Sequence, residues 1–213
     1  MLVRDRMTPN PITVTEDTPF QEALRLVREK RIRRLPVMDS ENNLIGIVTE
    51  KDLLYAAPSP RALSIFELHY HLAKLKLAPI INRKVVTTTP DTPLEEAARI
   101  MADHHIGALP VLEEGRLVGI ITETDIFKTF LELLGARESG QRLTLHVPNQ
   151  PGVLAALTTE IARRGGNIIA LGAFHSPDPD NRYVVVKLQG VPADELVAAL
   201  EALGQEVTDV RES

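Results

Sequence analysis

One segment of this chain occurs twice, and this repeat limits the folds that the sequence can adopt. The two copies are offset by 74 positions over most of their length and by 73 positions at their last glycines. The matching stretches are Asp17–Pro19 with Asp91–Pro93, Leu35–Val37 with Leu109–Val111, and Gly46–Asp52 with Gly119–Asp125. A period this long exceeds that of a solenoid unit, so we expect two small modules that pack against each other. Such a pair would form two related clefts.

The composition is that of an ordinary globular protein. The chain has 213 residues, of which 44% are hydrophobic and 25% charged, and its formal net charge is −5. Neither the repeat region nor residues 138–213 is basic, whereas nucleic-acid binding usually requires a basic face. The sequence contains no cysteine, no signal-peptide core and no run of about 20 apolar residues. We therefore expect a cytoplasmic protein that binds neither nucleic acid nor membrane.

Each module is predicted to fold in the order β-α-β-β-α. A short strand, at Ile12–Val14 in the first module, leads to an Asp-Thr-Pro sequence whose Asp is expected to cap the following helix. The helix residues recur at i, i+3, i+4 and i+7, as Phe20, Ala23, Leu24 and Val27, and as Leu94, Ala97, Ala98 and Met101. Two strands follow, and the last helix is expected to begin near Asp52 or Asp125.

The remaining segments complete the predicted α/β (α+β) organisation. Ser64–Leu77 has the spacing of an amphipathic helix, and residues 142–213 follow the ferredoxin-like order β-α-β-β-α-β. The predicted boundaries are 1–57 for the first module, 58–79 for the intervening helix and linker, 80–135 for the second module, 136–141 for a linker and 142–213 for the last domain.

These motifs resemble those of known regulatory domains. The Asp-Thr-Pro helix starts, the Leu-Pro-Val strands and the doubled Gly-Ile-x-Thr-x-x-Asp make the two modules similar to a tandem pair of CBS domains. Asn149–Leu154, which reads Asn-x-Pro-Gly-x-Leu, and Gly165–Ile168, which reads Gly-Gly-Asn-Ile, make the last domain similar to an ACT domain. The order CBS-CBS-ACT, which covers nearly the whole chain, resembles the acetoin-utilisation AcuB-like proteins.

The CBS resemblance implies an adenosine-nucleotide site in the clefts. In CBS pairs that bind nucleotides, the motif Asp accepts hydrogen bonds from ribose hydroxyls and the motif Thr contacts phosphate. The corresponding residues here are Thr49 with Asp52 and Thr122 with Asp125. Backbone amides at a helix start favour an anion, which suits this chemistry. The alternative is that both carboxylates only cap helices.

Four other residues are candidate nucleotide contacts. Arg33 and Arg34 precede the Leu-Pro-Val strand of the first module, where they could neutralise a polyphosphate or instead lie on a solvated face. Ile12 and Val86, in the predicted first strands, are candidates to sandwich an adenine or are simply core residues. AMP, ADP, ATP and S-adenosylmethionine fit this pattern equally well, and no resident cofactor is expected.

The ACT resemblance implies a small amino acid bound at a dimer interface. The candidate contacts are Asn149, Gly152, Asn167 and Ile168. Both asparagines match those of serine-binding ACT domains, but Val147 stands where that group has a histidine, which argues against serine itself. His146 should point to the opposite strand face. The alternative is a purely dimerising domain in which Asn149 shapes a turn and Gly165–Asn167 ends a helix.

We expect a homodimeric ligand sensor rather than an enzyme. One alternative is a scaffold that binds no ligand. Another is a regulator that docks on a metabolic enzyme through an exposed apolar patch near Leu131–Leu134. No metal site is expected, because His69 and His71 are two positions apart on a predicted helix, and His104 and His105 are adjacent.

Overall fold

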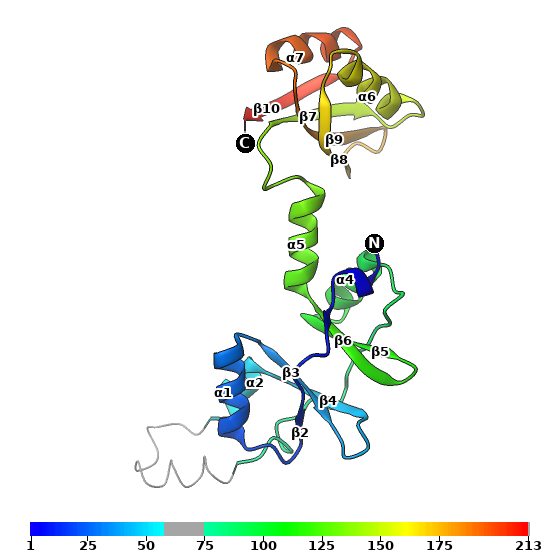
Figure 1. The fold of residues 1–213 in the computed structure, drawn as a ribbon. Helices are drawn as coiled ribbons and strands as arrows, with labels where there is room; N and C mark the ends of the chain where they lie inside the picture. The colour runs from blue at the N-terminus through cyan, green and yellow to red at the C-terminus, as the bar shows by residue number, and fades with distance from the viewer. Residues whose placement is uncertain (58–74, 213) are drawn as a thin grey trace. The chain divides into compact units, whose positions relative to one another are not determined.

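The computed structural model describes residues 1–57 and 75–212, which form two compact units (Figure 1). Unit 1 comprises Met1–Ile126 and contains both copies of the repeat, and unit 2 comprises Phe127–Ser213. The mixed α/β class is confirmed. Most of the predicted helix over residues 64–77, with His69 and His71, lies outside the described residues. Its last residues, 75–77, are described and are not helical.

The first module of unit 1 is a three-stranded sheet with two helices packed on it. Its elements are β2 (Val14–Thr15), α1 (Phe20–Lys30), β3 (Arg34–Met38), β4 (Leu44–Thr49) and α2 (Glu50–Ala56). The central strand β3 runs parallel to β2 and antiparallel to β4. Phe20, Ala23 and Val27 lie buried in one core with the strands, so the predicted apolar face of α1 is the one that packs on the sheet.

The second module repeats this arrangement with one strand reduced to a single bridge. Its elements are α4 (Leu94–Asp103), β5 (Ala108–Glu113), β6 (Arg116–Thr122) and α5 (Glu123–Leu133). Thr88 forms an isolated parallel bridge with Val111 where the first module has β2. The strand predicted at Ile12–Val14 overlaps β2 only at Val14, and neither Ile12 nor Val86 lies in a strand; each stands two residues before the pairing begins, at Val14 and at Thr88.

The segment that precedes each module packs on the other module. The strand β1 (Thr8–Pro9) pairs with β6 of the second module, where Val3 of the 3-10 helix η1 (Val3–Asp5) is fully buried. Conversely, Asn82 forms a bridge with Ile47 on β4, and Leu77 is fully buried in the core of the first module. Because of this exchange, the core of each module includes residues from the segment that precedes the other module in the sequence.

The expected caps of the first helices are wrong. Pro19 occupies the N-cap of α1 without any side-chain capping bond, and Asp17 instead pairs with Lys76, its carboxylate 2.6 Å from the ammonium. Pro93 likewise occupies the N-cap of α4, and Asp91 pairs with Arg4. Both basic partners belong to the exchanged segments, so these carboxylates join segments rather than cap helices.

Unit 2 carries the predicted β-α-β-β-α-β domain. Its elements are β7 (Gln141–Pro148), α6 (Val153–Arg163), β8 (Asn167–His175), β9 (Asn181–Gln189), α7 (Ala193–Ala202) and β10 (Glu206–Glu212). The strands form one antiparallel sheet in the order β10-β7-β9-β8. The core includes Leu143, Leu145 and Val147, which alternate along β7 and pack with Leu157 and Ile161 of α6.

Candidate functional site

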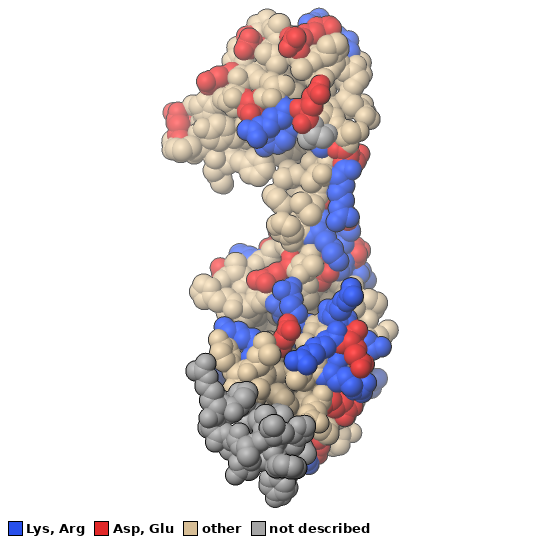
Figure 2. All heavy atoms as spheres, turned by 90° about the vertical axis from the view of Figure 1, so that its left-hand side faces the viewer, with Lys and Arg blue, Asp and Glu red and all other residues tan. Residues whose placement is uncertain are grey.

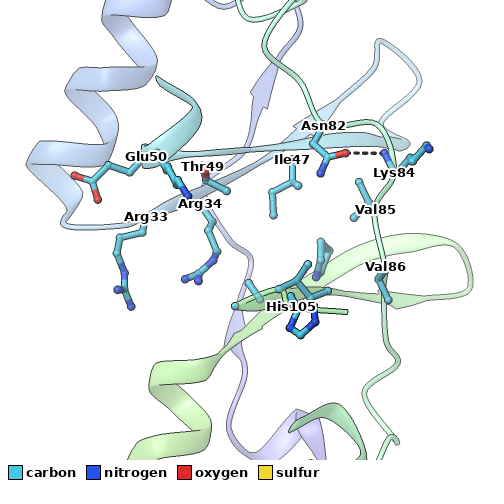
Figure 3. Close-up of a pocket in the computed structure, with 15 residues that line it drawn as sticks. Arg33, Arg34, Ile47, Thr49, Glu50, Asn82, Lys84, Val85, Val86 and His105 are labelled. Carbon is cyan, nitrogen blue, oxygen red and sulfur yellow. Dashed lines mark hydrogen bonds between the residues drawn. The ribbon is translucent and has the colours of Figure 1, made fainter. Parts of the chain in front are cut away.

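A first cleft in unit 1 has a volume of about 340 Å³ and lies between the modules (Figure 3). The first module lines it with Thr49, Glu50 and Lys51, where β4 passes into α2. Val86 lines the same cleft from the segment that crosses to this module. The structure thus brings Thr49 and the predicted adenine contact Val86 together in a cavity of a size usual for small-molecule sites.

The second cleft is the counterpart on the other copy of the repeat and has a volume of about 310 Å³. Thr122, Thr124 and Asp125 line it where β6 passes into α5. Ile12 lines it from the segment that follows β1. Because this segment crosses to the second module, Ile12 meets the second copy of the Thr-x-x-Asp motif and not the first.

Each Thr-x-x-Asp motif folds back on itself at the start of a helix. Oδ2 of Asp52 accepts hydrogen bonds from the backbone N (2.9 Å) and Oγ1 (2.6 Å) of Thr49, whose Oγ1 also accepts from the backbone N of Asp52 at 3.2 Å. Oδ2 of Asp125 accepts from the backbone N (3.0 Å) and Oγ1 (2.6 Å) of Thr122. These bonds satisfy an amide and a hydroxyl at each helix start, and in α2 Asp52 is the N3 partner of the N-cap Thr49 in a capping box.

The two carboxylates nevertheless differ in their access to a ligand. Asp125 lines the second cleft, whereas Asp52 is not among the residues that line the first cleft. The repeated motif alone does not distinguish Asp52 from Asp125. Of the two carboxylates, Asp125 is the one that lines a cleft.

Arg33 and Arg34 line both clefts. Nη2 of Arg33 donates to Oγ1 of Thr124 at 2.9 Å, and Nη2 of Arg34 lies 3.8 Å from Oε2 of Glu123. Burial, and next the charge of Arg33, lower the pKa of Arg34, while Glu123 and Asp125 oppose this shift. The sequence predicted that the two side chains lie near the first module, but they extend beyond it. They reach the helix start of the second module.

The glycine at position 107 makes room for this arrangement. A Cβ on Gly107 would lie 2.0 Å from Nη2 of Arg34 and 2.6 Å from Oε2 of Glu123. Gly107 stands 74 positions after Arg33, and Ala108 stands 74 positions after Arg34. Small residues in the second module thus leave space that the arginines of the first module occupy.

We expect Gly107→Ala to displace the Arg34 side chain at little cost in stability. The added methyl meets only the flexible ends of two side chains, so the free energy of unfolding should fall by less than about 1 kcal/mol. Gly46→Ala is the matched control, because its Cβ would lie 2.0 Å from Cγ2 of Ile81 and 3.0 Å from the carbonyl O of Asn82. Urea unfolding should show the larger loss for Gly46→Ala, and the reverse order would contradict this account.

Figure 2 shows a face of unit 1 on which Lys and Arg side chains are clustered, with Asp and Glu side chains among them. The first cleft is lined by Lys51 and Lys84 in addition to the arginine pair, and by one acidic residue, Glu50. The second cleft is lined by Arg31 in addition to the pair, and by Asp125. Both clefts therefore carry a local excess of positive charge that suits an anionic ligand.

Unit 2 has a smaller cavity of about 170 Å³ beside the turn after β7. Asn149 lines it, with Oδ1 accepting from Nε of Arg182 at 2.7 Å and Nδ2 donating to the carbonyl O of Pro179 at 3.3 Å. Gly152 has φ of +90° and is the N-cap of α6. Asn149 therefore shapes this turn, and it also faces a cavity large enough for a small molecule.

Asn167 and Ile168 lie far from this cavity within one chain. Asn167 begins β8 and pairs with Gln189 at the end of β9. Asn149, in contrast, directly follows Pro148, which pairs with Asn181 at the start of β9. Eight residues of strand separate Asn181 from Gln189, which corresponds to roughly 26 Å. A joint site for Asn149 and Asn167 would therefore require two copies of the domain.

His146 projects from the sheet face opposite Val147, as predicted. Its Nδ1 lies 3.0 Å from Oε2 of Glu206, and its Nε2 lies 3.3 Å from Oγ of Ser176. Neither His146 nor its two partners line any of the three cavities described above. Sequence spacing could not reveal this contact set, because its members come from three separate parts of unit 2.

The described residues show neither a cluster of metal-ligating side chains nor a helix suited to span a membrane. Residues 1–57 and 75–212 contain no group of three or more His, Cys, Asp or Glu side chains placed to hold a metal ion. Within the same residues, no helix is long and apolar enough to cross a membrane.

Family models match almost the whole chain. The CBS domain model matches residues 3–59 and 77–132, and the TTHA0829-like ACT domain model matches residues 139–211. The chain belongs to the CBS domain family and carries a tandem CBS pair followed by a TTHA0829-like ACT domain. Unit 1 contains the CBS pair up to Ile126, and unit 2 contains the ACT domain together with residues 127–132 of the second CBS match.

Three solved structures resemble the CBS pair. A protein named for acetoin utilization (AcuB) from Vibrio cholerae is 32% identical, with a TM-score of 0.53 over 65% of this chain and 96% of its own. The CBS domain pair of protein MJ0100, in complex with 5-methylthioadenosine and S-adenosyl-L-methionine, is 28% identical, with a TM-score of 0.52 over 65% and 98%. CBSX2 in complex with AMP is 29% identical, with a TM-score of 0.52 over 62% and 97%.

Proposed function

We propose that this protein is a regulatory sensor that binds an adenosine nucleotide in its CBS pair and performs no catalysis itself. The observation that carries the proposal is the meeting of Ile12, Thr122 and Asp125 in the second cleft. These residues come from opposite ends of unit 1, and they provide the three kinds of contact that an adenosine nucleotide needs.

The chemistry of each contact follows from its residue type. Ile12 offers an apolar surface to the adenine, and the carboxylate of Asp125 accepts hydrogen bonds from the ribose hydroxyls. Thr122 and the amides at the start of α5, together with Arg33 and Arg34, favour the phosphate. The first cleft offers Val86 and Thr49 for the same roles, without Asp52 in its lining.

The similar structures support an adenosine ligand. The CBS pair of MJ0100 was solved with two adenosine compounds, and CBSX2 was solved with AMP. AMP is therefore the first candidate here, with ADP, ATP and S-adenosylmethionine as the other members of the class.

We expect AMP to raise the melting temperature of the protein in a concentration-dependent manner. A ligand that binds only the folded state adds about 2.7 kcal/mol at roughly 100 times its Kd, which corresponds to several degrees for a domain of this size. Guanosine monophosphate is the control, since it carries the same phosphate on a different base. An absence of any shift with AMP, ADP, ATP and S-adenosylmethionine would contradict the proposal and favour the scaffold.

The ACT domain is proposed to bind a small amino acid between two copies of the chain. The cavity beside Asn149 and Arg182 suits a ligand of that size, and an arginine can pair with a carboxylate. Binding in the CBS pair would then be linked to the ACT domain through two arrangements of a homodimer that the ligands favour unequally.

A second candidate function is docking on a metabolic enzyme. Phe127, Phe130 and Leu133 recur along α5, and their exposed fractions are 61%, 44% and 65%. This apolar face lies close to the patch predicted near Leu131–Leu134. Similarity to AcuB suggests acetoin breakdown as the pathway of such a partner.

A further inference from the structure

The two clefts of unit 1 have two residues in common. Arg33 and Arg34 line both of them, and no other described residue is among those lining both. In Figure 3 both side chains extend from the first module toward the second. The hydrogen bond from Arg33 to Thr124 and the approach of Arg34 to Glu123 hold the guanidiniums beside the start of α5.

This sharing breaks the symmetry of the repeat. In the second cleft Arg33 and Arg34 form the wall that Gly107 and Ala108 form in the first cleft, since these pairs are 74 positions apart. Gly107 has no side chain and Ala108 has only a methyl group, so neither can reach across to the second cleft. The arginines can reach the first cleft, because a side chain at position 107 would occupy their space.

The other cations of the clefts are not shared. Lys51 and Lys84 line only the first cleft, and Arg31 lines only the second. Each cleft therefore has some positive charge of its own, and the common pair supplies the rest. A guanidinium engages a phosphate through directed hydrogen bonds, so it cannot fully serve two ligands at once.

We propose that Arg33 and Arg34 form one phosphate clamp shared by the two clefts, so that a polyphosphate nucleotide in either cleft weakens binding of a second in the other. This inference rests on the proposed nucleotide function. The first ligand takes the guanidiniums, and its negative charge also repels the second ligand. The CBS pair consequently binds the first equivalent of nucleotide more tightly than the second.

Calorimetric titration of the full chain with ATP tests the clamp. We expect the second dissociation constant to be at least tenfold weaker than the first. In the double variant Arg33→Gln/Arg34→Gln, the first ATP should bind more weakly, and the ratio of the two constants should fall to within threefold. Gly107→Ala retains both charges but pushes Arg34 out of its place, so it should also reduce the ratio while keeping ATP binding measurable.

Arg31→Gln and Lys84→Gln are the matched controls, because each removes one cation from a single cleft. Each control should weaken one of the two dissociation constants by severalfold and leave the other unchanged, whereas the double variant should change both. Two equal and independent constants in the wild type would overturn the clamp while supporting the nucleotide function. A ratio that persists in both the double variant and Gly107→Ala would also overturn it. AMP binding without ATP binding by the wild type would overturn the clamp alone. No binding of AMP, ADP, ATP or S-adenosylmethionine would instead count against the nucleotide function itself.

Discussion

Asp125→Asn is expected to weaken AMP binding by about 10- to 100-fold, the factor that follows from losing hydrogen bonds to a charged acceptor. The amide oxygen of Asn can still accept from the backbone N of Thr122, so the helix start should persist. The change removes the negative charge that faces the second cleft. Calorimetry on the full chain would give the affinity, and urea unfolding would confirm that stability is nearly unchanged.

Asp52→Asn is the matched control for this experiment. Asp52 makes the same bonds to Thr49 that Asp125 makes to Thr122, but it is not among the residues that line the first cleft. We expect less than a threefold change in AMP affinity for this variant. Equal losses in the two variants would mean that the clefts use their carboxylates alike, and a large loss only in Asp52→Asn would reverse the assignment.

The sequence predicted the parts of the fold that repeat a pattern. The two copies of Thr-x-x-Asp predicted two helix starts, and α2 and α5 begin at Glu50 and Glu123. The apolar period of α1 predicted which face is buried. Alternation along β7 predicted that Val147 and His146 point to opposite faces. In each case, contacts between residues near in sequence determine the structure.

The sequence could not predict the shared position of the arginines. Position 33 carries Arg in one copy and position 107 carries Gly in the other, and this difference alone does not say across which cleft a long side chain extends. The answer depends on the space left at Gly107 and on Glu123 and Thr124, which lie about 90 positions away. Such contacts are set by the packing of the two modules.

The sequence could not predict the exchanged segments, for a different reason. Val3 and Leu77 occupy equivalent places in the two cores, but the residues around them share almost no identity. A buried aliphatic side chain is enough to fill each place, so burial preserves the structural repeat without preserving the sequence. The predicted boundary at residues 79 and 80 remains a prediction, although Leu77, Ile80 and Ile81 all pack on the first module.

This exchange leads to the largest expected loss of stability. Leu77→Ala should lower the free energy of unfolding of unit 1 by about 2 to 5 kcal/mol, because it removes a fully buried side chain and leaves a cavity in the core of the first module. Leu54→Ala is the matched control, since Leu54 is 58% exposed on α2 and should cost less than about 0.5 kcal/mol.

Hydrogen–deuterium exchange, measured peptide by peptide in the full chain, would locate the effect of Leu77→Ala. Faster exchange is expected in α1 and in the β3–β4 hairpin, which precede Leu77 by 28 positions or more, while β7–β10 of unit 2 should be unaffected. A loss no larger than that of Leu54→Ala would mean that the crossing segment is not part of the first core. The expected result would mean that the first module needs the segment ahead of the second module to complete its core.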